Sequence, residues 1–168
     1  MEEKKRKVIT EDDVIAQGGE LKPDKPVDEQ IMLPGKYEVT PEHTFRVNLF
    51  VEQVENRWVV REKMNKNCEH HWVEFRMWTF AEEIELRKLA TTYDPLKRLH
   101  FVDHDMLNRL KVQRLMKEWT FQNENERLHL HHVNGVLTDE CYKNFQGLFA
   151  NIVRAIIEGM NGVLEYNG

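Results

Sequence analysis

Residues 44–52 read TFRVNLFVE, and apolar side chains occupy every second position of this stretch. Successive side chains on a strand point to opposite sides of the sheet, so the alternation predicts a strand that buries one face. The residues on the buried face are expected to be Phe45, Val47, Leu49 and Val51. The opposite face is mainly polar, which is typical of a strand that has one side toward solvent.

Two further short strands are expected to pair with this one. A turn at Glu55-Asn56 precedes the run Trp58-Val59-Val60, and residues 71–78 again carry apolar side chains at alternate positions. The links between the three runs are short, whereas parallel neighbours need a long crossover connection. The sequence therefore predicts a three-stranded antiparallel meander.

After Trp78 the spacing of apolar residues becomes helical. Thr79 and Glu82 have the spacing of a capping box, in which the threonine side chain accepts from an early N–H and the glutamate reaches back. We expect this first helix to end near Asp94-Pro95, because proline cannot continue a helix.

Three more helices are expected downstream. Asp103 is a good N-cap for a helix that reaches Trp119, and Thr138 caps the next one. The last helix carries a continuous apolar stripe within residues 152–164. The predicted fold class is thus α+β, with an N-terminal extended arm, a three-stranded antiparallel meander and then about four helices.

The N-terminal arm differs in composition from the rest of the chain. Residues 1–33 contain nine carboxylates, six cationic side chains and no aromatic residue, so the segment has a net charge of −3. Such a segment cannot bury enough apolar surface to fold by itself. Its spaced apolar residues are expected to dock on a partner: Val8, Ile9, Val14, Ile15, Ile31, Met32 and Leu33. The alternative is a solvated tail.

The domain prediction follows from this difference in composition. Residues 1–35 are expected to form an extended arm that a partner orders, and residues 36–168 a single α+β domain. Within that domain we expect the strands at about 37–78 and the helices at about 79–165.

The whole chain has 168 residues, 40% of them hydrophobic, and a formal net charge of −5. The acidic balance disfavours generic polyanion binding, and no apolar run is long enough to cross a membrane. The basic cluster at residues 4–7 is not followed by the apolar stretch of a secretory signal. Cys68 and Cys141 cannot form a disulfide framework, so we expect a soluble protein made in a reducing compartment.

Eight histidines justify a test for a metal site. The candidate ligands are Cys68, His70, His71, His100, His104, His129, His131 and His132. Zinc needs three or four converging ligands, yet the chain has no HExxH and no second cysteine pair, and adjacent strand histidines face opposite ways. We therefore predict no metal and no cofactor, and keep a metal-dependent enzyme as an alternative.

Nucleophilic catalysis is not predicted either. The chain contains no serine and no Gly-rich phosphate-binding loop. Cys141 is expected in the first turn of a helix, where the dipole lowers a thiol pKa, but Asp139 and Glu140 beside it act in the opposite direction. The sequence therefore favours a protein that is not an enzyme.

A nucleic-acid-associated accessory protein is the other alternative. It would use the basic run Lys4–Lys7 and a mildly basic face of the expected helix at 107–119. The basic side chains of that face are Arg109, Lys111, Arg114 and Lys117, and a solvated helix surface is the favoured interpretation of it. Neighbouring carboxylates neutralise the run, so the field around it is short-ranged. Nucleic acid is therefore an unlikely partner on the sequence alone.

Residues 75–165 show a pattern that resembles a known group of proteins. Its parts are FRMWTFAEEIELRKLATTYDP at 75–95, LHFVDHDMLNRLKVQRLMKEWTF at 99–121, NGVLTDECYKNF at 134–145 and IVRAIIEGMNGVLE at 152–165. This order of elements is similar to that of small helical proteins of tailed bacteriophages, particularly tail assembly chaperones and related tail or baseplate components. The resemblance supplies no catalytic residues.

The resemblance implies a non-enzymatic structural or assembly protein that acts through protein–protein contacts in a phage tail or baseplate. Its partners would be other tail or baseplate proteins, in several copies, and not a membrane. Its location would be the host cytoplasm during assembly, and the virion if the chain is retained there.

Overall fold

The computed structural model describes residues 37–123 and 126–163. The chain divides into two units, Met1–Glu38 and Val39–Gly168. The arm predicted at residues 1–35 and its seven apolar docking residues lie outside the described residues. The second unit is α+β, as the sequence predicts, with four helices and antiparallel sheets within its described part.

The described helices are α2 (Phe80–Leu89), α3 (His104–Leu115), α4 (Asp139–Gln146) and α5 (Ala150–Gly162). The main sheet contains β1 (Thr44–Val54), β2 (Arg57–Arg61), β3 (Cys68–Arg76) and β6 (Met116–Trp119). Three two-stranded sheets are formed by β4 (Thr91–Asp94) with β5 (Leu99–Val102), β7 (Gln122–Asn123) with β8 (Glu126–Arg127), and β9 (His132–Val133) with β10 (Val136–Leu137). No helix among the described residues is both long and apolar enough to cross a membrane.

The strand order β2-β1-β3-β6 corrects the predicted meander, because β1 and not β2 lies between two neighbours. β1 has 11 residues and pairs with β3 over Thr44–Glu52 and with β2 over Phe50–Val54. β2 pairs with one edge of β1 and β3 with the other edge. Side-chain hydrogen bonds to β1 hold the β2–β3 connection between them. There Glu52 accepts hydrogen bonds from Arg61 at 2.7 Å and from the Asn65 side chain at 3.4 Å.

The fourth strand, β6, occupies residues that were predicted to end a helix. α3 stops at Leu115, and Met116 is already extended, with φ −66° and ψ 125°. Met116 and Trp119 pair with Phe75 and Val73 of β3 and are almost completely buried. Their spacing of three residues fits a helix face as well as this bulged strand, so the spacing alone could not separate the two.

The hairpin of β4 and β5 also replaces expected helix. α2 ends at Leu89, and the β-branched and aromatic run Thr91-Thr92-Tyr93 favours an extended chain. The Asp94 carboxylate accepts from the backbone N–H groups of Leu96 and Lys97 at 2.9 and 3.1 Å and so forms the turn around Pro95. The predicted helix end near Asp94-Pro95 is therefore wrong, because α2 ends at Leu89 and Pro95 lies in the turn between β4 and β5.

The predicted helix starts are confirmed. Thr79 and Glu82 form the reciprocal capping box, and the Asp103 carboxylate accepts from two N–H groups of the first turn of α3. The Thr138 side chain accepts from the backbone N–H of Cys141 at the start of α4. Helix N-termini are predictable because unpaired N–H groups need a nearby acceptor.

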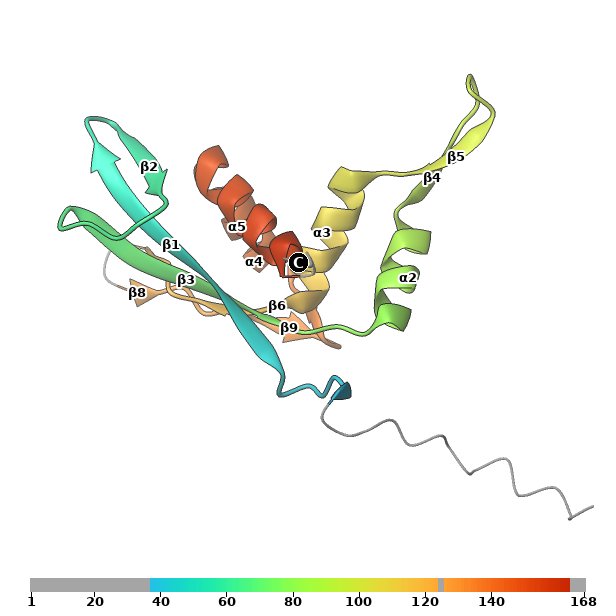
Figure 1. Ribbon diagram of the computed structural model, residues 1–168, viewed down its shortest axis with the longest axis horizontal. Helices are drawn as coiled ribbons and strands as arrows, with labels where there is room; N and C mark the ends of the chain where they lie inside the picture. The colour runs from blue at the N-terminus through green and yellow to red at the C-terminus, as the bar shows by residue number, and fades with distance from the viewer. Residues whose placement is uncertain (1–36, 124–125, 164–168) are drawn as a thin grey trace, which may run out of the picture. The chain divides into compact units, whose positions relative to one another are not determined.

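The main core joins the sheet to α3, α4 and α5, and Figure 1 shows these helices on one side of the sheet. The buried face of β1 is the predicted one, and α5 buries Ile152, Ile156 and Met160 of its predicted stripe. A separate small core joins α2 to α3 through Leu86, Ala90 and Leu107.

Candidate functional site

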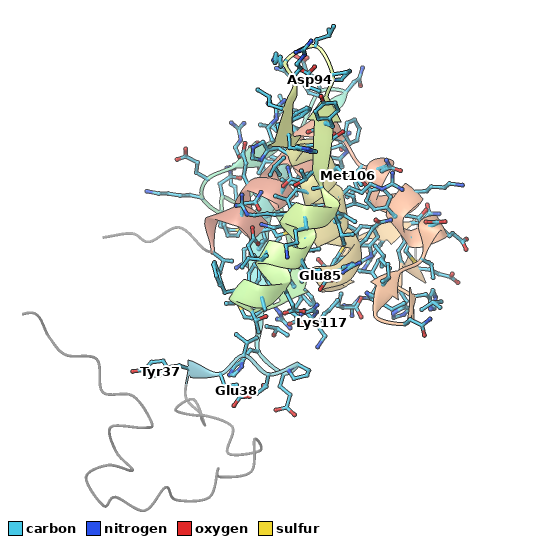
Figure 2. The ribbon with its side chains drawn as sticks, turned by 90° about the vertical axis from the view of Figure 1, so that its right-hand side faces the viewer. Tyr37, Glu38, Glu85, Asp94, Met106 and Lys117 are labelled. Carbon is cyan, nitrogen blue, oxygen red and sulfur yellow. The ribbon has the colours of Figure 1, made fainter. Side chains whose placement is uncertain are left out.

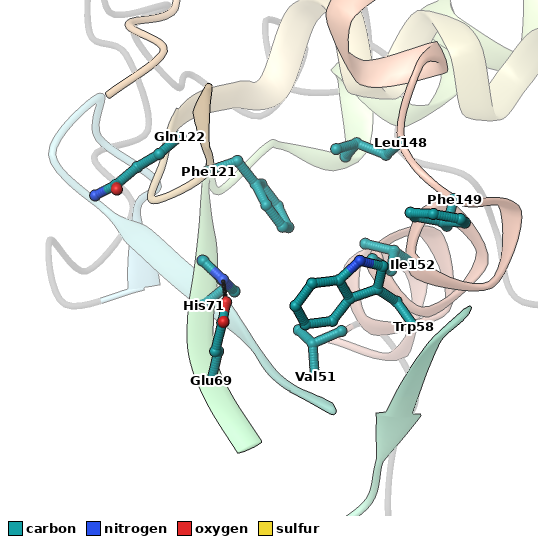
Figure 3. Close-up of a pocket in the computed structure, with 9 residues that line it drawn as sticks. All are labelled: Val51, Trp58, Glu69, His71, Phe121, Gln122, Leu148, Phe149 and Ile152. Carbon is teal, nitrogen blue, oxygen red and sulfur yellow. Dashed lines mark hydrogen bonds and ion pairs between the residues drawn. The ribbon is translucent and has the colours of Figure 1, made fainter. Parts of the chain in front are cut away.

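A pocket of about 440 Å³ opens between the ends of β1–β3 and the start of α5 (Figure 3). Its apolar lining comes from Val51, Trp58, Phe121, Leu148, Phe149 and Ile152, and its polar lining from Glu69, His71 and Gln122. Apolar pockets with a few polar groups are common ligand sites, so the polar groups decide what this pocket could do.

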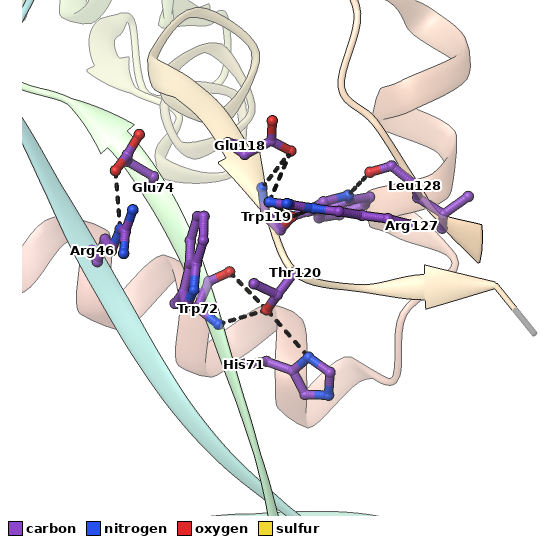
Figure 4. Close-up of polar contacts among 9 residues, drawn as sticks. All are labelled: Arg46, His71, Trp72, Glu74, Glu118, Trp119, Thr120, Arg127 and Leu128. Carbon is purple, nitrogen blue, oxygen red and sulfur yellow. Dashed lines mark hydrogen bonds and ion pairs between the residues drawn. The ribbon is translucent and has the colours of Figure 1, made fainter. Parts of the chain in front are cut away.

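His71 connects the polar groups of this pocket. Its Nε2 lies 3.3 Å from a Glu69 carboxylate oxygen and its Nδ1 lies 3.3 Å from the Thr120 hydroxyl, while its ring stacks on Phe121 at 4.8 Å between centroids. A carboxylate, an imidazole and a hydroxyl in series are the parts of an activated nucleophile. The Thr120 hydroxyl, however, also accepts the backbone N–H of Trp72 at 2.9 Å. This hydrogen bond continues the pairing between β3 and β6 beyond Trp119 (Figure 4). The pairing therefore accounts for the position of the Thr120 hydroxyl next to His71.

Trp72 lies on the face of the sheet opposite α5 and is flanked by two arginines (Figure 4). The Arg46 guanidinium is 3.9 Å and that of Arg127 is 5.6 Å from the ring centroid. Arg46 also pairs with Glu74 at 3.0 Å, and Arg127 with Glu118 at 3.7 Å. Base stacking needs an open aromatic face, and this indole already has a cation over it, so the arrangement does not favour nucleic-acid binding.

The basic side chains predicted on one helix face do not share a face. Lys111 is buried, Arg114 pairs with Glu85 at 3.4 Å, and Lys117 lies on β6. Arg109 lies 5.3 Å from the Tyr142 ring. The expected solvated basic face is therefore wrong, because the helix ends before Lys117 and turns Lys111 into the core. The run Lys4–Lys7 lies outside the described residues.

A buried ion pair joins α2 to α3. Lys111 Nζ lies 3.0 Å from a Glu83 carboxylate oxygen, and the two side chains are 5% and 11% exposed. Trp78 Nε1 donates to Glu83 at 2.7 Å and Arg87 Nε donates to it at 2.9 Å. Lys111 also approaches the Asn161 side chain of α5 at 3.4 Å, so this network connects three helices.

The ionisation of Glu83 predicts how stability depends on pH. Burial raises the pKa of this carboxyl, but hydrogen bonds from Lys111, Trp78 and Arg87 and the positive charge of Lys111 together outweigh burial and hold the pKa below its usual value. A lowered folded-state pKa adds stability that is fully present above about pH 5 and is lost as the pH falls through the folded-state pKa. We expect Glu83→Gln to destabilise the protein at pH 7, and the difference from wild type to shrink below about pH 4. Urea unfolding at pH 7, 5 and 3.5 measures this, and a difference that stays constant with pH would contradict it.

The candidate metal ligands are spread over the fold. His70 bonds the Asn48 side chain at 3.0 Å on one face of the sheet, and His71 points to the other face. His132 Nε2 lies 2.7 Å from the Met116 carbonyl oxygen, and the backbone N–H of His131 approaches Cys141 Sγ at 3.3 Å. The other candidates lie on β3, on β5, at the start of α3 and before β9: Cys68, His100, His104 and His129. In residues 37–123 and 126–163, no three His, Cys, Asp or Glu side chains gather as a metal site would need.

The most unusual surface is formed by α2, the β4–β5 hairpin and the first turn of α3, which we call the helix–hairpin surface. The hairpin extends beyond the ends of α2 and α3, away from the main sheet (Figure 1). Figure 2 looks onto α2, with Asp94 at the far end of the hairpin and Met106 on α3. The exposed large apolar side chains of this surface are Phe80, Ile84, Leu89, Tyr93, Leu96, Leu99, Phe101 and Met106.

The sequence did not identify this surface. Phe80 and Ile84 have the spacing of one helix face, yet Phe80 is 80% exposed and the side of α2 that packs on α3 carries Glu83 and Leu86. The available signal was the turn sequence Asp94-Pro95-Leu96, which places a leucine where turns normally carry polar residues.

No protein-family model, curated protein or solved structure matches the chain.

Proposed function

We propose that this chain is a non-enzymatic structural or assembly protein of a tailed bacteriophage that acts through protein–protein contacts in the tail or baseplate. The helix–hairpin surface carries the proposal. Eight of the fourteen exposed large apolar side chains in the described part of the chain lie between Phe80 and Met106. Exposed apolar side chains concentrated on neighbouring elements favour an interaction site, because water otherwise contacts them at a free-energy cost. Seven of these eight residues lie within the quoted parts of the phage-like pattern, and Leu96 lies between two of the parts.

The end of the hairpin supports a docking role. Leu96 is 94% exposed and sits in a turn that Pro95 and the Asp94 carboxylate make rigid. A rigid turn loses little conformational entropy when a partner covers it, so more of the apolar burial contributes to affinity. Lys97 and Arg98 follow directly and add positive charge to this end.

The proposed partners are other tail or baseplate proteins, present in several copies. The proposed place of action is the host cytoplasm during assembly, and retention of the chain would also place it in the virion. Repeated copies favour weak individual contacts, because each bound site raises the effective concentration at the next.

The test is a double substitution, Leu96→Lys with Phe101→Lys, in the full-length chain. We expect the variant to fold but to co-purify at least about tenfold less with tail intermediates or virions, because two buried lysines would oppose docking. Quantitative mass spectrometry of purified particles measures this.

Met64→Lys is the matched control for this experiment. Met64 is also exposed but belongs to the β2–β3 connection, outside the helix–hairpin surface. We expect Met64→Lys to leave co-purification unchanged. Equal incorporation of both variants at the wild-type level would overturn the proposed role of this surface.

A further inference from the structure

We infer that the chain forms a dimer in which the β5 strands of two copies pair antiparallel along their free edges. The two hairpins then make one sheet in the order β4-β5-β5-β4. This inference rests on the proposed role of the helix–hairpin surface in protein–protein contacts and names a second copy of the chain as one partner there. Strand addition of this kind takes its affinity from backbone hydrogen bonds and its specificity from side chains.

The register of the hairpin shows which backbone groups lie on the free edge of β5. The Asp103 N–H donates to the Ala90 carbonyl oxygen at 2.8 Å, so these residues form a hydrogen-bonded pair next to the strands. Hydrogen-bonded and non-hydrogen-bonded pairs alternate along an antiparallel ladder. The backbone groups of Phe101 therefore bond β4, and those of His100 and Val102 point away from it. Within the described part of the chain no other strand pairs with this edge.

The edge of β5 lacks the features that normally prevent strand addition. Proteins protect exposed edges with prolines, lysines, β-bulges or a covering element. Residues 99–102 read LHFV, without proline or lysine, and pair with β4 in an unbroken register. Leu99, His100 and Phe101 are exposed, and the hairpin extends beyond the ends of α2 and α3 (Figure 1). A second copy can therefore approach along this strand.

One register pairs all the free-edge backbone groups of two β5 strands. It places His100 of each copy opposite Val102 of the other, and each of these pairs exchanges backbone hydrogen bonds. Phe101 then lies opposite Phe101 of the second copy in a non-hydrogen-bonded pair, where the Cα atoms are about 4.5 Å apart and the side chains are closest. Leu99 shares the face of Phe101, because side chains alternate along a strand. The exposed apolar side chains of both copies therefore gather on one face of the joined sheet, where aromatic cross-strand pairs add stability.

The two ends of β5 carry opposite charges, and this favours an antiparallel second copy as the occupant. The turn before β5 holds Lys97 and Arg98 against Asp94, a net charge of +1, whereas Asp103 and Asp105 follow β5. Neither Arg98 nor the exposed Asp105 has an ion-pair partner among the residues that the structure describes. Antiparallel pairing brings the basic end of each strand beside the acidic end of the other. The strand is thus complementary to itself at both ends, as a two-fold symmetric contact requires.

Two proline substitutions in the full-length chain test which edge pairs. His100→Pro removes an N–H from the free edge of β5, and Tyr93→Pro removes the N–H of the residue directly opposite, on the free edge of β4. Both variants lose the same ring contact, at 5.1 Å between centroids, and keep the bonds between β4 and β5. We expect His100→Pro to raise the dissociation constant of the dimer at least about tenfold, and Tyr93→Pro to change it by less than about threefold. Sedimentation velocity over a range of concentrations measures this.

A cross-linking experiment tests the register independently of the prolines. In a Cys68→Ala background, Phe101→Cys places two thiols opposite each other at the symmetry axis, within the Cα separation that a disulfide needs. Leu99→Cys is the matched control on the same face. Leu99 lies opposite Asp103 of the second copy, so its two copies would be roughly 13 Å apart. We expect Phe101→Cys to form a covalent dimer at least about tenfold faster on oxidation, as measured by non-reducing gel electrophoresis.

A wild-type chain that stays monomeric would overturn the inference, as would a His100→Pro variant that associates like wild type. Weaker association of Tyr93→Pro, alone or together with His100→Pro, would overturn the pairing through β5. Cross-linking of Leu99→Cys at least as fast as that of Phe101→Cys would overturn the register. All these measurements use the purified chain without tail particles. A monomeric chain whose Leu96→Lys, Phe101→Lys variant is lost from particles would therefore overturn the dimer and leave the proposed function standing.

Discussion

Replacing Lys111 by methionine is expected to lower the free energy of unfolding by about 3 kcal/mol, because it leaves the Glu83 carboxylate buried without its ammonium partner. Removing one partner of a buried ion pair costs about 3–5 kcal/mol. We expect the lower value because Trp78 and Arg87 still donate to Glu83. Urea unfolding at pH 7, followed by tryptophan fluorescence, measures the change.

Two further variants show whether the cost comes from the buried charge. Lys117→Met removes an exposed lysine from β6 and should change stability by less than about 0.5 kcal/mol. Glu83→Leu combined with Lys111→Met removes both charges and should recover part of the loss, because the buried Trp78 Nε1–H then lacks its acceptor. If Lys111→Met were as mild as Lys117→Met, the ion pair would not hold α2 on α3 in solution.

The local features of this fold could be predicted from the sequence. The strand at 44–54 and the caps at Thr79, Asp103 and Thr138 depend on residues close in sequence, because side-chain alternation and N–H capping are local interactions. The apolar stripe of α5 also follows from local spacing. These predictions are confirmed by the structure.

Features that depend on distant partners could not be predicted in this way. Met116 and Trp119 form a strand only because the edge of β3 is available to pair with them. β1 lies between β2 and β3 because the connection at residues 62–67 returns to its other edge, which no alternation pattern specifies. Tertiary pairing overrides local spacing in both cases.

The same reasoning explains why neither the burial of Lys111 nor the helix–hairpin surface was predicted. Lys111 was expected on a solvated helix face, yet it is buried because Glu83, from a helix about 30 residues earlier, supplies the opposite charge. Phe80 and Ile84 have the spacing of one helix face, but no described element covers them. Spacing identifies which residues share a face and cannot identify whether another element packs on it. The docking role predicted for Val8 and the other arm residues stays a prediction.

Gly159→Ala is expected to destabilise the protein by about 1–3 kcal/mol, although alanine is normally the better residue inside a helix by about 1 kcal/mol. α5 packs so closely on β1 that a Cβ at Gly159 would lie 2.5 Å from Val47 Cγ1 and 3.3 Å from Val47 Cβ. Rotating the valine side chain cannot move its own Cβ, so the helix or the strand must shift. Thermal or urea unfolding measures the loss.

Gly162→Ala is the matched control, because this glycine is in the same helix and a Cβ there would meet nothing within 4 Å. We expect that variant to be neutral or slightly stabilising, so only Gly159→Ala should lower the free energy of unfolding. Val47→Ala alone creates a cavity and should cost about 2 kcal/mol. If the close approach is the cause, Val47→Ala with Gly159→Ala should cost at least about 1 kcal/mol less than the sum of the single substitutions. Strictly additive costs would mean that Gly159 is required for a reason other than the contact between α5 and β1.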